Sequence, residues 1–321
     1  MILGIDGGGT KTLYALCTEA GDVLCVLRRP SIDLAQRGED GLRAALRDGV
    51  RDALREAGGQ EWGGLSAVCL GAPCWGESRT GDQVTQRVAR DVFGETPLYI
   101  CNDAEIACAG SFALRPGINI VAGTGTIAFG VDAHGRTARC GGWGHYFADE
   151  GSGYWLGMRM LSLFCKQADG RRPKQALYHL AREHFGLEWD FDIIDLIVND
   201  YLPYRDKVAG LQMLLFEAAE QGDAGALDSY REAGCEIALN VKGILERLDF
   251  RTGAAVSYSG GIFKAGPMIM DSFRAELEAS GCAVVQPLAP PWAGALMRAL
   301  RLIGRDTPRA LEKLIEAGKT E

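Results

Sequence analysis

Several hallmarks of membrane, nucleic-acid-binding and secreted proteins are missing from this sequence. No apolar run approaches the roughly 20 residues that a membrane-spanning helix needs, and the 34 Lys and Arg residues form no basic stripe in a chain of net charge −8. We therefore expect neither a membrane nor a nucleic acid as a partner. The N-terminal segment Met1–Asp6 has no basic residue before its carboxylate, which is atypical of a secretion signal and predicts a cytoplasmic protein.

The spacings typical of metal sites are missing as well. The ten cysteines include no C-x-x-C pair, and the four histidines form no H-E-x-x-H motif. Several cysteines, such as Cys69 and Cys101, stand within apolar runs. These patterns favour small buried thiols in a reducing compartment and disfavour a zinc site.

The chain is long enough for two domains. It has 321 residues, of which 47% are hydrophobic, and a single hydrophobic core rarely grows beyond about 250–300 residues. We place the boundary at Arg115-Pro116-Gly117, which gives one domain at 1–115 and a larger one at 116–321. We expect the domains to close about this same segment.

Hydrophobic periodicity predicts a repeated architecture in an α/β protein. The first half reads as three strands in an antiparallel meander, followed by helix, strand, helix, strand and helix. The pattern of strand, Gly/Thr turn and strand begins again at Gly117, which indicates a duplicated fold with two related halves. The predicted elements of the first half are the strands Ile2–Asp6, Thr12–Thr18, Val23–Leu27, Leu65–Leu70 and Leu98–Cys101, and the helices Glu39–Ala57, Gln83–Val92 and Ala104–Leu114.

After the repeated strands, the second half is predicted to be mostly helical. A predicted strand at Ala254–Tyr258 leads into Gly260-Gly261, and a strand at Ala283–Val285 follows a further helix. The remaining predicted elements are the strands Ile118–Ala122 and Ile127–Val131, and the helices Gly153–Ala168, Lys174–Phe185, Phe191–Asn199, Asp206–Glu220, Ala224–Leu248, Ala293–Ile303 and Pro308–Ala317.

The strongest local signal is the glycine-rich segment Gly4–Thr12. Glycine permits positive φ and brings backbone N–H groups close to phosphate oxygens, while Thr10 and Thr12 add hydroxyl donors. Asp6, at the end of the preceding strand, is suited to hold Mg²⁺ through water. Thr10 stands where a P-loop needs lysine, and Thr12 where the dinucleotide motif G-x-G-x-x-G needs its last glycine. The segment therefore predicts either a phosphate-binding hairpin or an ordinary glycine turn between strands.

The first glycine segment strengthens the interpretation of two others as ligand-binding turns. Gly123-Thr124-Gly125-Thr126 alone fits a hairpin turn, but as the repeat partner of the first segment it predicts a second phosphate loop. Gly260 and Gly261 lie between a predicted strand and a helix. That position suits a flat ligand against the backbone, or an ordinary turn before a helix N-terminus.

Asp103 is the candidate catalytic base. It directly follows a predicted strand, and the carboxyl end of a strand is where α/β folds commonly bind ligands and place catalytic groups. The alternative is that Asp103 only caps the helix that begins at Ala104.

The segment Gly141–Trp155 combines aromatic rings, glycines and paired acids. Aromatic rings cover the apolar face of a sugar, and carboxylates accept hydrogen bonds from hydroxyls. This composition is typical of a carbohydrate-binding loop; the alternative is a rigid loop between domains with a capping acid.

In combination, the segments D-G-G-G-T-K-T, G-T-G-T and G-G-W-G…D-E-G-S resemble the BadF/BadG/BcrA/BcrD ATPase family, and within it the N-acetylglucosamine kinases. The resemblance covers almost the whole chain, including Pro290–Ala295. It implies two ribonuclease-H-like (actin-like ATPase) domains, each a mixed sheet flanked by helices, with a helical insertion in the second and a cleft between them for ATP and Mg²⁺. The implied activity is ATP-dependent phosphorylation of an amino sugar, N-acetylglucosamine or glucosamine. We also expect a homodimer.

The resemblance extends to individual residues. It implies that Asp103 is the catalytic aspartate and contacts the sugar. Lys11 and Thr12 complete the predicted first phosphate loop. The matching nucleotide-binding residues are Asp6, Gly8, Gly9, Thr10, Gly123, Thr124, Gly125, Gly260 and Gly261, with Asp6 also at the metal. The matching sugar-binding residues are Gly142, Trp143, Gly144 and Asp149.

One segment departs from the family pattern. Acetylglucosamine kinases have a sugar-contacting asparagine after the first meander, but Pro30–Asp33 contains none. We expect Asp33 to replace it, where a carboxylate would pair with the ammonium group of glucosamine. The segment Gly71–Glu77 is also unusual, so the identity of the sugar stays open.

Two other functions compete with the kinase. One is an ATPase that activates an acyl-CoA dehydratase or reductase, with an iron–sulfur cluster held by cysteines near helix N-termini at a dimer interface. The cysteines here are scattered and stand mostly inside predicted strands and helices, which favours the kinase. The other is a regulator without catalysis, which the presence of both Asp6 and Asp103 disfavours.

Overall fold

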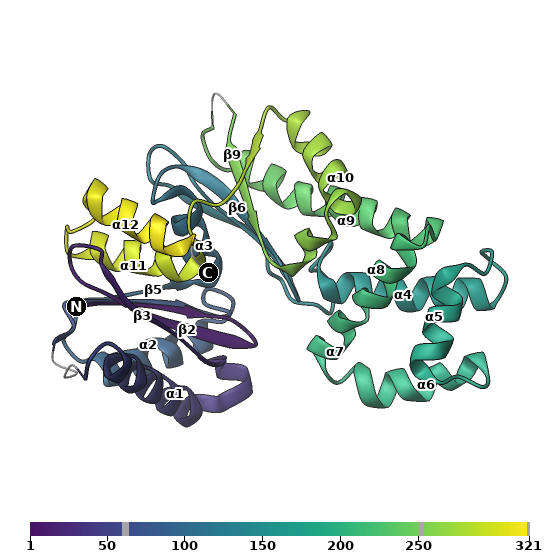
Figure 1. Ribbon diagram of the computed structural model, residues 1–321, viewed down its shortest axis with the longest axis horizontal. Coiled ribbons are helices and arrows are strands. Elements are labelled where there is room, and N and C mark those ends of the chain that lie inside the picture. The colour runs from purple at the N-terminus through teal and green to yellow at the C-terminus, as the bar shows by residue number, and fades with distance from the viewer. Residues whose placement is uncertain (60–63, 251–252, 320–321) are drawn as a thin grey trace. The chain divides into compact units, whose positions relative to one another are not determined.

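The computed structural model describes residues 1–59, 64–250 and 253–319 (Figure 1). The chain forms two compact units, and each is built from separate stretches of sequence. The first unit comprises Met1–Asn119, Phe129–Thr137 and Val285–Glu321, and the second comprises Ile120–Ala128 and Ala138–Val284.

The first sheet has the strand order β3-β2-β1-β4-β5. β1 pairs antiparallel with β2, and β2 with β3, which confirms the predicted meander, whereas β4 and β5 continue the sheet in parallel with β1. Because the parallel strands share a direction, their carboxyl ends lie at one edge. The strands are β1 (Ile2–Gly7), β2 (Lys11–Cys17), β3 (Val23–Pro30), β4 (Ala67–Ala72) and β5 (Leu98–Asn102).

Helices cover both faces of this sheet. Side chains alternate along β1, so Leu3 and Ile5 pack in a core with α1 and α2, while Ile2 packs in a second core with α11 and α12. Gly38 interrupts α1 with φ 67° and ψ 178°, and the predicted helix Glu39–Ala57 corresponds to the part after this kink. The helices of the first unit are α1 (Leu34–Glu56), α2 (Arg79–Phe93), α3 (Asp103–Phe112), α11 (Pro291–Leu302) and α12 (Pro308–Gly318).

The end of the chain returns to the first sheet. The Cβ of any larger residue at Gly4 would lie 2.8 Å from the backbone nitrogen of Leu296, so glycine in β1 permits α11 to lie directly on the strand. Val285–Glu321 thus belongs to the unit that contains the N-terminal sheet. The division into domains at 1–115 and 116–321 stays a prediction.

The second sheet has the strand order β10-β9-β6-β7-β8. Read from the meander outward, this order repeats that of the first sheet, so the predicted duplication of an α/β fold is confirmed. Its strands are β6 (Gly117–Ala122), β7 (Thr126–Val131), β8 (Thr137–Gly141), β9 (Ala255–Ser259) and β10 (Ala283–Val285).

The second unit carries a helical insertion, drawn in teal and green in Figure 1. The predicted helix Asp206–Glu220 is divided at Leu211 into α7 and α8. The helices of this unit are α4 (Gly153–Ala168), α5 (Ala176–Phe185), α6 (Ile193–Leu196), α7 (Arg205–Gly210), α8 (Gln212–Glu220), α9 (Ala224–Leu245) and α10 (Pro267–Glu278), with a π-helical turn at Ile197–Tyr201 and 3₁₀ turns at Asp190–Asp192 and Gly261–Ala265. Within the described ranges, no helix combines the length and apolar character needed to cross a membrane.

Candidate active site

The first glycine turn, Gly7–Lys11, joins β1 to β2 at the carboxyl end of β1. The N–H of Gly8 donates to the carbonyl of Lys11 at 2.9 Å and closes the turn. Gly9, Thr10 and Lys11 are exposed, so this part of the turn is open to a ligand.

Two side chains that follow β3 hold the first glycine turn in place. Ser31 Oγ donates to the carbonyl of Gly8 at 2.7 Å, and Gln36 Nε2 donates to the carbonyl of Gly9 at 2.8 Å. Neither residue was predicted from the sequence. Each bonds to a carbonyl more than 20 positions away, a contact that no local motif marks.

Two predicted ligand-binding residues make structural hydrogen bonds in the same region. Thr12 is buried, and its Oγ1 accepts from the N–H of Ile32 at 3.1 Å. Asp33 is the N-cap of α1, where its Oδ1 accepts from the N–H of Ala35 at 2.8 Å. That Thr12 contacts the nucleotide stays a prediction, and so does the contact of Asp33 with the sugar.

Asp6 and Asp103 are brought together by the parallel edge of the first sheet. Asp6 in β1 pairs with Gly71 in β4, and Ala72 pairs with Asn102, the last residue of β5, so Asp103 follows directly at this edge. Burial raises the pKa of the Asp6 carboxyl to about 6, against the opposing effect of the Lys11 cation. Burial and then the negative charge of Asp6 raise the pKa of Asp103 to about 7. The charge of Asp6 therefore acts on a second carboxyl, Asp103, that burial already disfavours as an anion.

Asp103 does not serve as the N-cap of α3. That position belongs to Asn102, whose Oδ1 accepts from the N–H of Ala104 at 2.9 Å. Asp103 is the first residue of the helix, and its own Oδ1 also lies 2.9 Å from this N–H. The N–H of Ala104 is therefore shared between the cap Asn102 and Asp103.

The loop after β4 adds further charge near Asp103. Cys74 adopts a left-handed backbone with φ 60°, and Asn102 Nδ2 donates to the carbonyl of Trp75 at 3.1 Å. Burial raises the pKa of the Cys74 thiol to about 12, and the carboxylates of Glu77, Asp33 and Asp103 contribute to the rise. Three acidic side chains, one of them within the loop, therefore act on Cys74.

The second glycine turn, Gly123–Thr126, joins β6 to β7 in the second unit. The N–H of Gly123 donates to the carbonyl of Gly125 at 2.9 Å. Two N–H groups from the first turn of α4 bind the carbonyls of the turn: Gly153 donates to Gly123 at 2.8 Å, and Tyr154 donates to Thr124 at 3.3 Å. The start of α4 thus fixes the backbone of this turn.

Asp149 lies against the second glycine turn. It is buried, with a left-handed backbone of φ 63°. Its Oδ1 accepts from the N–H of Thr126 at 3.3 Å, and its Oδ2 accepts from Arg205 Nη2 at 2.6 Å. Both carboxylate oxygens therefore have partners inside the second unit, and the predicted contact of Asp149 with a sugar stays a prediction. No local motif marks Arg205, which lies 56 positions from Asp149.

The segment before Asp149 presents aromatic rings to solvent. Trp143, Tyr146 and Phe147 are exposed by 72%, 84% and 76%, and large apolar side chains so exposed are suited to stack on a ligand. Gly142 and Gly144 have φ of 70° and 97°, so both need the freedom of glycine.

The Gly260-Gly261 segment follows β9 at the point where this strand lies beside β6. Gly260 has φ 105°, and a Cβ there would lie 2.2 Å from the carbonyl oxygen of Ala122. An ideal Cβ at Gly261 meets no atom within 4 Å. Close backbone packing thus requires Gly260, while the space next to Gly261 is open.

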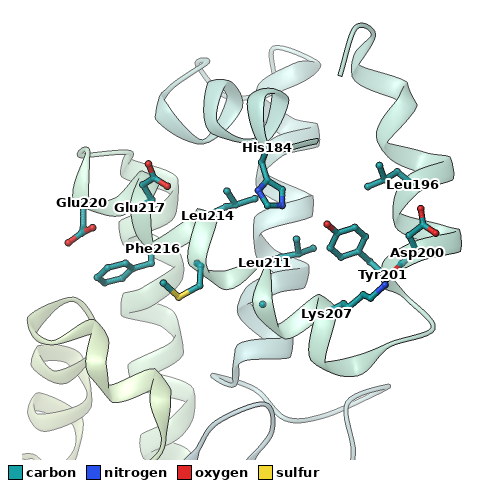
Figure 2. Close-up of a pocket in the computed structure, with 12 residues that line it drawn as sticks. His184, Leu196, Asp200, Tyr201, Lys207, Leu211, Leu214, Phe216, Glu217 and Glu220 are labelled. Carbon is teal, nitrogen blue, oxygen red and sulfur yellow. Dashed lines mark hydrogen bonds between the residues drawn. The ribbon is translucent and has the colours of Figure 1, made fainter. Parts of the chain in front are cut away.

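A cavity of about 940 Å³ lies elsewhere in the second unit, among α5, α6, α7 and α8 (Figure 2). Its lining combines three leucines with polar side chains, which are His184, Tyr201, Lys207, Asp200, Glu217 and Glu220. None of the residues that line this cavity was predicted as a site residue.

A model of the BadF/BadG/BcrA/BcrD ATPase family matches residues 3–299. The chain belongs to this family. It is similar to an N-acetylmuramic acid/N-acetylglucosamine kinase of Clostridium acetobutylicum, with 30% identity over 275 residues that cover 85% of this chain and 89% of the relative. It is also similar to an N-acetyl-D-glucosamine kinase of Dictyostelium discoideum, with 31% identity covering 70% of this chain and 72% of the relative.

A solved structure supports the same fold. The crystal structure of a Chromobacterium violaceum protein, provisionally named an N-acetylglucosamine kinase, matches with a TM-score of 0.76 at 24% identity, covering 92% of this chain and 97% of that one. The two mixed sheets with flanking helices are thus those of the actin-like ATPase fold, as predicted.

As a member of the BadF/BadG/BcrA/BcrD ATPase family, the protein is expected to bind ATP partly through Thr124. Thr124→Val removes only the hydroxyl and should weaken ATP binding about tenfold, since a hydrogen bond to a charged phosphate is lost. Isothermal titration calorimetry measures this. Ser257→Ala is the control, because the Ser257 hydroxyl is buried in the same unit without a hydrogen-bond partner. Equal affinities of wild type and Thr124→Val would remove this hydroxyl from the nucleotide site.

Proposed function

We propose that this protein transfers the γ-phosphoryl group of ATP to a hydroxyl of an amino sugar, N-acetylglucosamine or glucosamine, with Asp103 as general base. The observation that carries the proposal is the position of Asp103, next to Asp6 at the carboxyl ends of parallel strands. Family membership and similarity to proteins named as amino-sugar kinases support the same activity.

Both glycine turns and the Gly260 segment are proposed to bind ATP. The exposed part of the first turn offers N–H groups and the Thr10 hydroxyl, and two N–H groups of α4 bind the carbonyls of the second turn. The full proposed set is Asp6, Gly8, Gly9, Thr10, Lys11, Thr12, Gly123, Thr124 and Gly125 for the phosphates and Gly260 and Gly261 for the adenosine.

Asp6 is proposed to hold Mg²⁺. A carboxylate whose pKa is raised to about 6 by burial lacks solvation, and a hard oxygen ligand in such a place fits a small divalent cation. Among the described residues, no three His, Cys, Asp or Glu side chains are grouped so that they could hold a metal ion. Phosphate oxygens and water would therefore complete the coordination, and the ion would neutralise charge on the phosphates.

Asp103 is proposed to orient the acceptor hydroxyl and take its proton. As the oxygen–phosphorus bond to the sugar forms, the proton passes to the carboxylate of Asp103, and the bond between the γ-phosphorus and its bridging oxygen breaks to release ADP. Positioning and charge stabilisation supply most of the rate in such a transfer. A base with a pKa near 7 is well matched to proton transfer at neutral pH.

The sugar is proposed to contact Gly142, Trp143, Gly144, Asp149, Asp103 and Asp33. The exposed Trp143 ring suits stacking on the apolar face of a sugar. Carboxylates near the acceptor, among them Asp33 and Glu77 beside Cys74, favour a substrate with a positive charge.

We further propose a cytoplasmic homodimer. The cytoplasm supplies ATP and Mg²⁺, and the described cysteines are all free thiols. Between residues 189 and 213, large apolar side chains are exposed that a second copy would cover; they are Trp189, Phe191, Ile194, Val198, Leu202, Tyr204 and Met213. Light scattering of the purified protein tests this, and a monomer at micromolar concentration would overturn it.

A screen for ADP release tests the activity itself. The acceptors are glucosamine, N-acetylglucosamine, N-acetylmannosamine, N-acetylmuramic acid and glucose. We expect turnover that depends on an amino sugar. The alternative, an ATPase that activates an acyl-CoA dehydratase or reductase, would hydrolyse ATP without any response to these sugars.

Asp103→Asn keeps the shape of the side chain and removes its charge. We expect kcat to fall about 10²–10⁴-fold, the usual contribution of a general base. The Kd for ATP, measured by calorimetry, should stay within about twofold, since Asp103 touches the acceptor. Near-full kcat in this variant would show that the base lies elsewhere, with Asp149 as the next carboxylate to test.

Asp33→Asn tests the charge of Asp33 without loss of the helix cap, because asparagine caps helices as well as aspartate. We expect the ratio of kcat/KM for glucosamine to that for N-acetylglucosamine to fall about fivefold, equivalent to about 1 kcal/mol. Asp33→Ala is the comparison that also removes the cap. A ratio that does not change in Asp33→Asn would exclude Asp33 from sugar selection.

A further inference from the structure

Arg205 is the charged residue that connects the helical insertion to the second glycine turn. It begins α7, and its Nη2 lies 2.6 Å from Asp149 Oδ2. The same nitrogen lies 2.3 Å from where a Cβ at Gly125 would be. The guanidinium is therefore in direct contact with both Asp149 and the turn.

The helix that carries Arg205 is closely packed on α4. A Cβ at Gly157 would lie 2.0 Å from the carbonyl oxygen of Val208, and one at Gly153 would lie 3.5 Å from Ala209 Cβ. Val208 is fully buried. Since the start of α4 also binds the carbonyls of the second glycine turn, α4 contacts both the turn and α7. Arg205, at the start of α7, contacts the same turn directly at Gly125.

Asp149 depends on a partner for its charge. Its side chain is 2% exposed, whereas that of Arg205 is 41% exposed, and a buried carboxylate without a paired charge is unstable. Its backbone is also in the left-handed region at φ 63°, which only surrounding contacts can maintain. The pair with Arg205 is the ionic contact that fixes the carboxylate on the N–H of Thr126.

We propose that Arg205 is a positioning residue of the active site, which acts through Asp149 to hold the second glycine turn in the conformation that binds phosphate. This proposal rests on the proposed function, because it assumes that the turn binds ATP. The arginine lies near the aromatic loop as well: after burial, its cation is the next cause that lowers the pKa of His145. It is therefore placed where the turn and the loop proposed to bind sugar meet.

A double-mutant cycle tests whether Arg205 acts through Asp149. The variants are Arg205→Met, Asp149→Asn and the pair of them, measured for ATP affinity by calorimetry without sugar and for kcat and KM with it. Asparagine tolerates the left-handed backbone and still accepts from Thr126. Arg205→Met should weaken ATP binding and lower kcat/KM for ATP about 10-fold to 100-fold, because a small displacement of a positioning group has effects of this size. In the Asp149→Asn background, the same change should cost less than about threefold.

Two further variants make the test decisive. Arg205→Lys keeps the positive charge, so it should recover at least part of the lost affinity, and it covers the case in which Arg205→Met fails to fold. Arg231→Met removes an exposed arginine paired with Asp228 in the same unit and should leave all constants unchanged. Circular dichroism confirms the fold of each variant.

The outcomes separate this proposal from the proposed function. If the wild type binds no ATP, the proposed function fails. If the wild type binds ATP and the effects of Arg205→Met and Asp149→Asn simply add, Arg205 acts independently of Asp149 and the positioning proposal is wrong. The proposal is also wrong if ATP affinity is unchanged in folded Arg205→Met.

Discussion

The parallel pairing of β1, β4 and β5 is the constraint on which the candidate active site depends. It brings the carboxyl ends of three strands to one edge, so residues far apart in the sequence, Asp6 and Asp103, meet where the charge of Asp6 raises the cost of ionising Asp103. Gly4 contributes on the face of the sheet that α11 covers, since only glycine permits this helix to pack directly on β1. The fold therefore places the poorly solvated carboxylates of Asp6 and Asp103 where they are suited to bind a divalent cation and an acceptor hydroxyl.

The second unit repeats this architecture but gives its glycine turn a different support. The first turn is held by Ser31 and Gln36, side chains from the segment after β3. The second is held by the N–H groups that begin α4 and by the Asp149–Arg205 pair. Duplication thus preserved the strands and the turns, while the contacts that stabilise each turn come from the parts of the chain that differ between the halves.

Strand and turn patterns in the sequence predicted most of the fold, because the meanders and the glycine turns are local. The return of α11 to the first sheet depends on contacts nearly 300 residues apart, such as Gly4 with Leu296, and periodicity carries no information about them. The same limit applies to Arg205, whose partner Asp149 is recognisable by motif while the arginine is not. The position of Asp103 at a strand end was predictable, but Asn102 as the actual helix cap emerged only from the structure.

The pH dependence of kcat/KM for the amino sugar tests the central claim that Asp103 is the ionised base. Because its pKa is raised, to about 7 in the free protein, activity should be lost as pH falls and the carboxylate is protonated. The charge of Glu77 contributes to this rise, so Glu77→Gln should move the acidic limb of the profile to lower pH. A limb at the same pH in wild type and Glu77→Gln, or activity that stays constant from pH 5 to 8, would contradict the account.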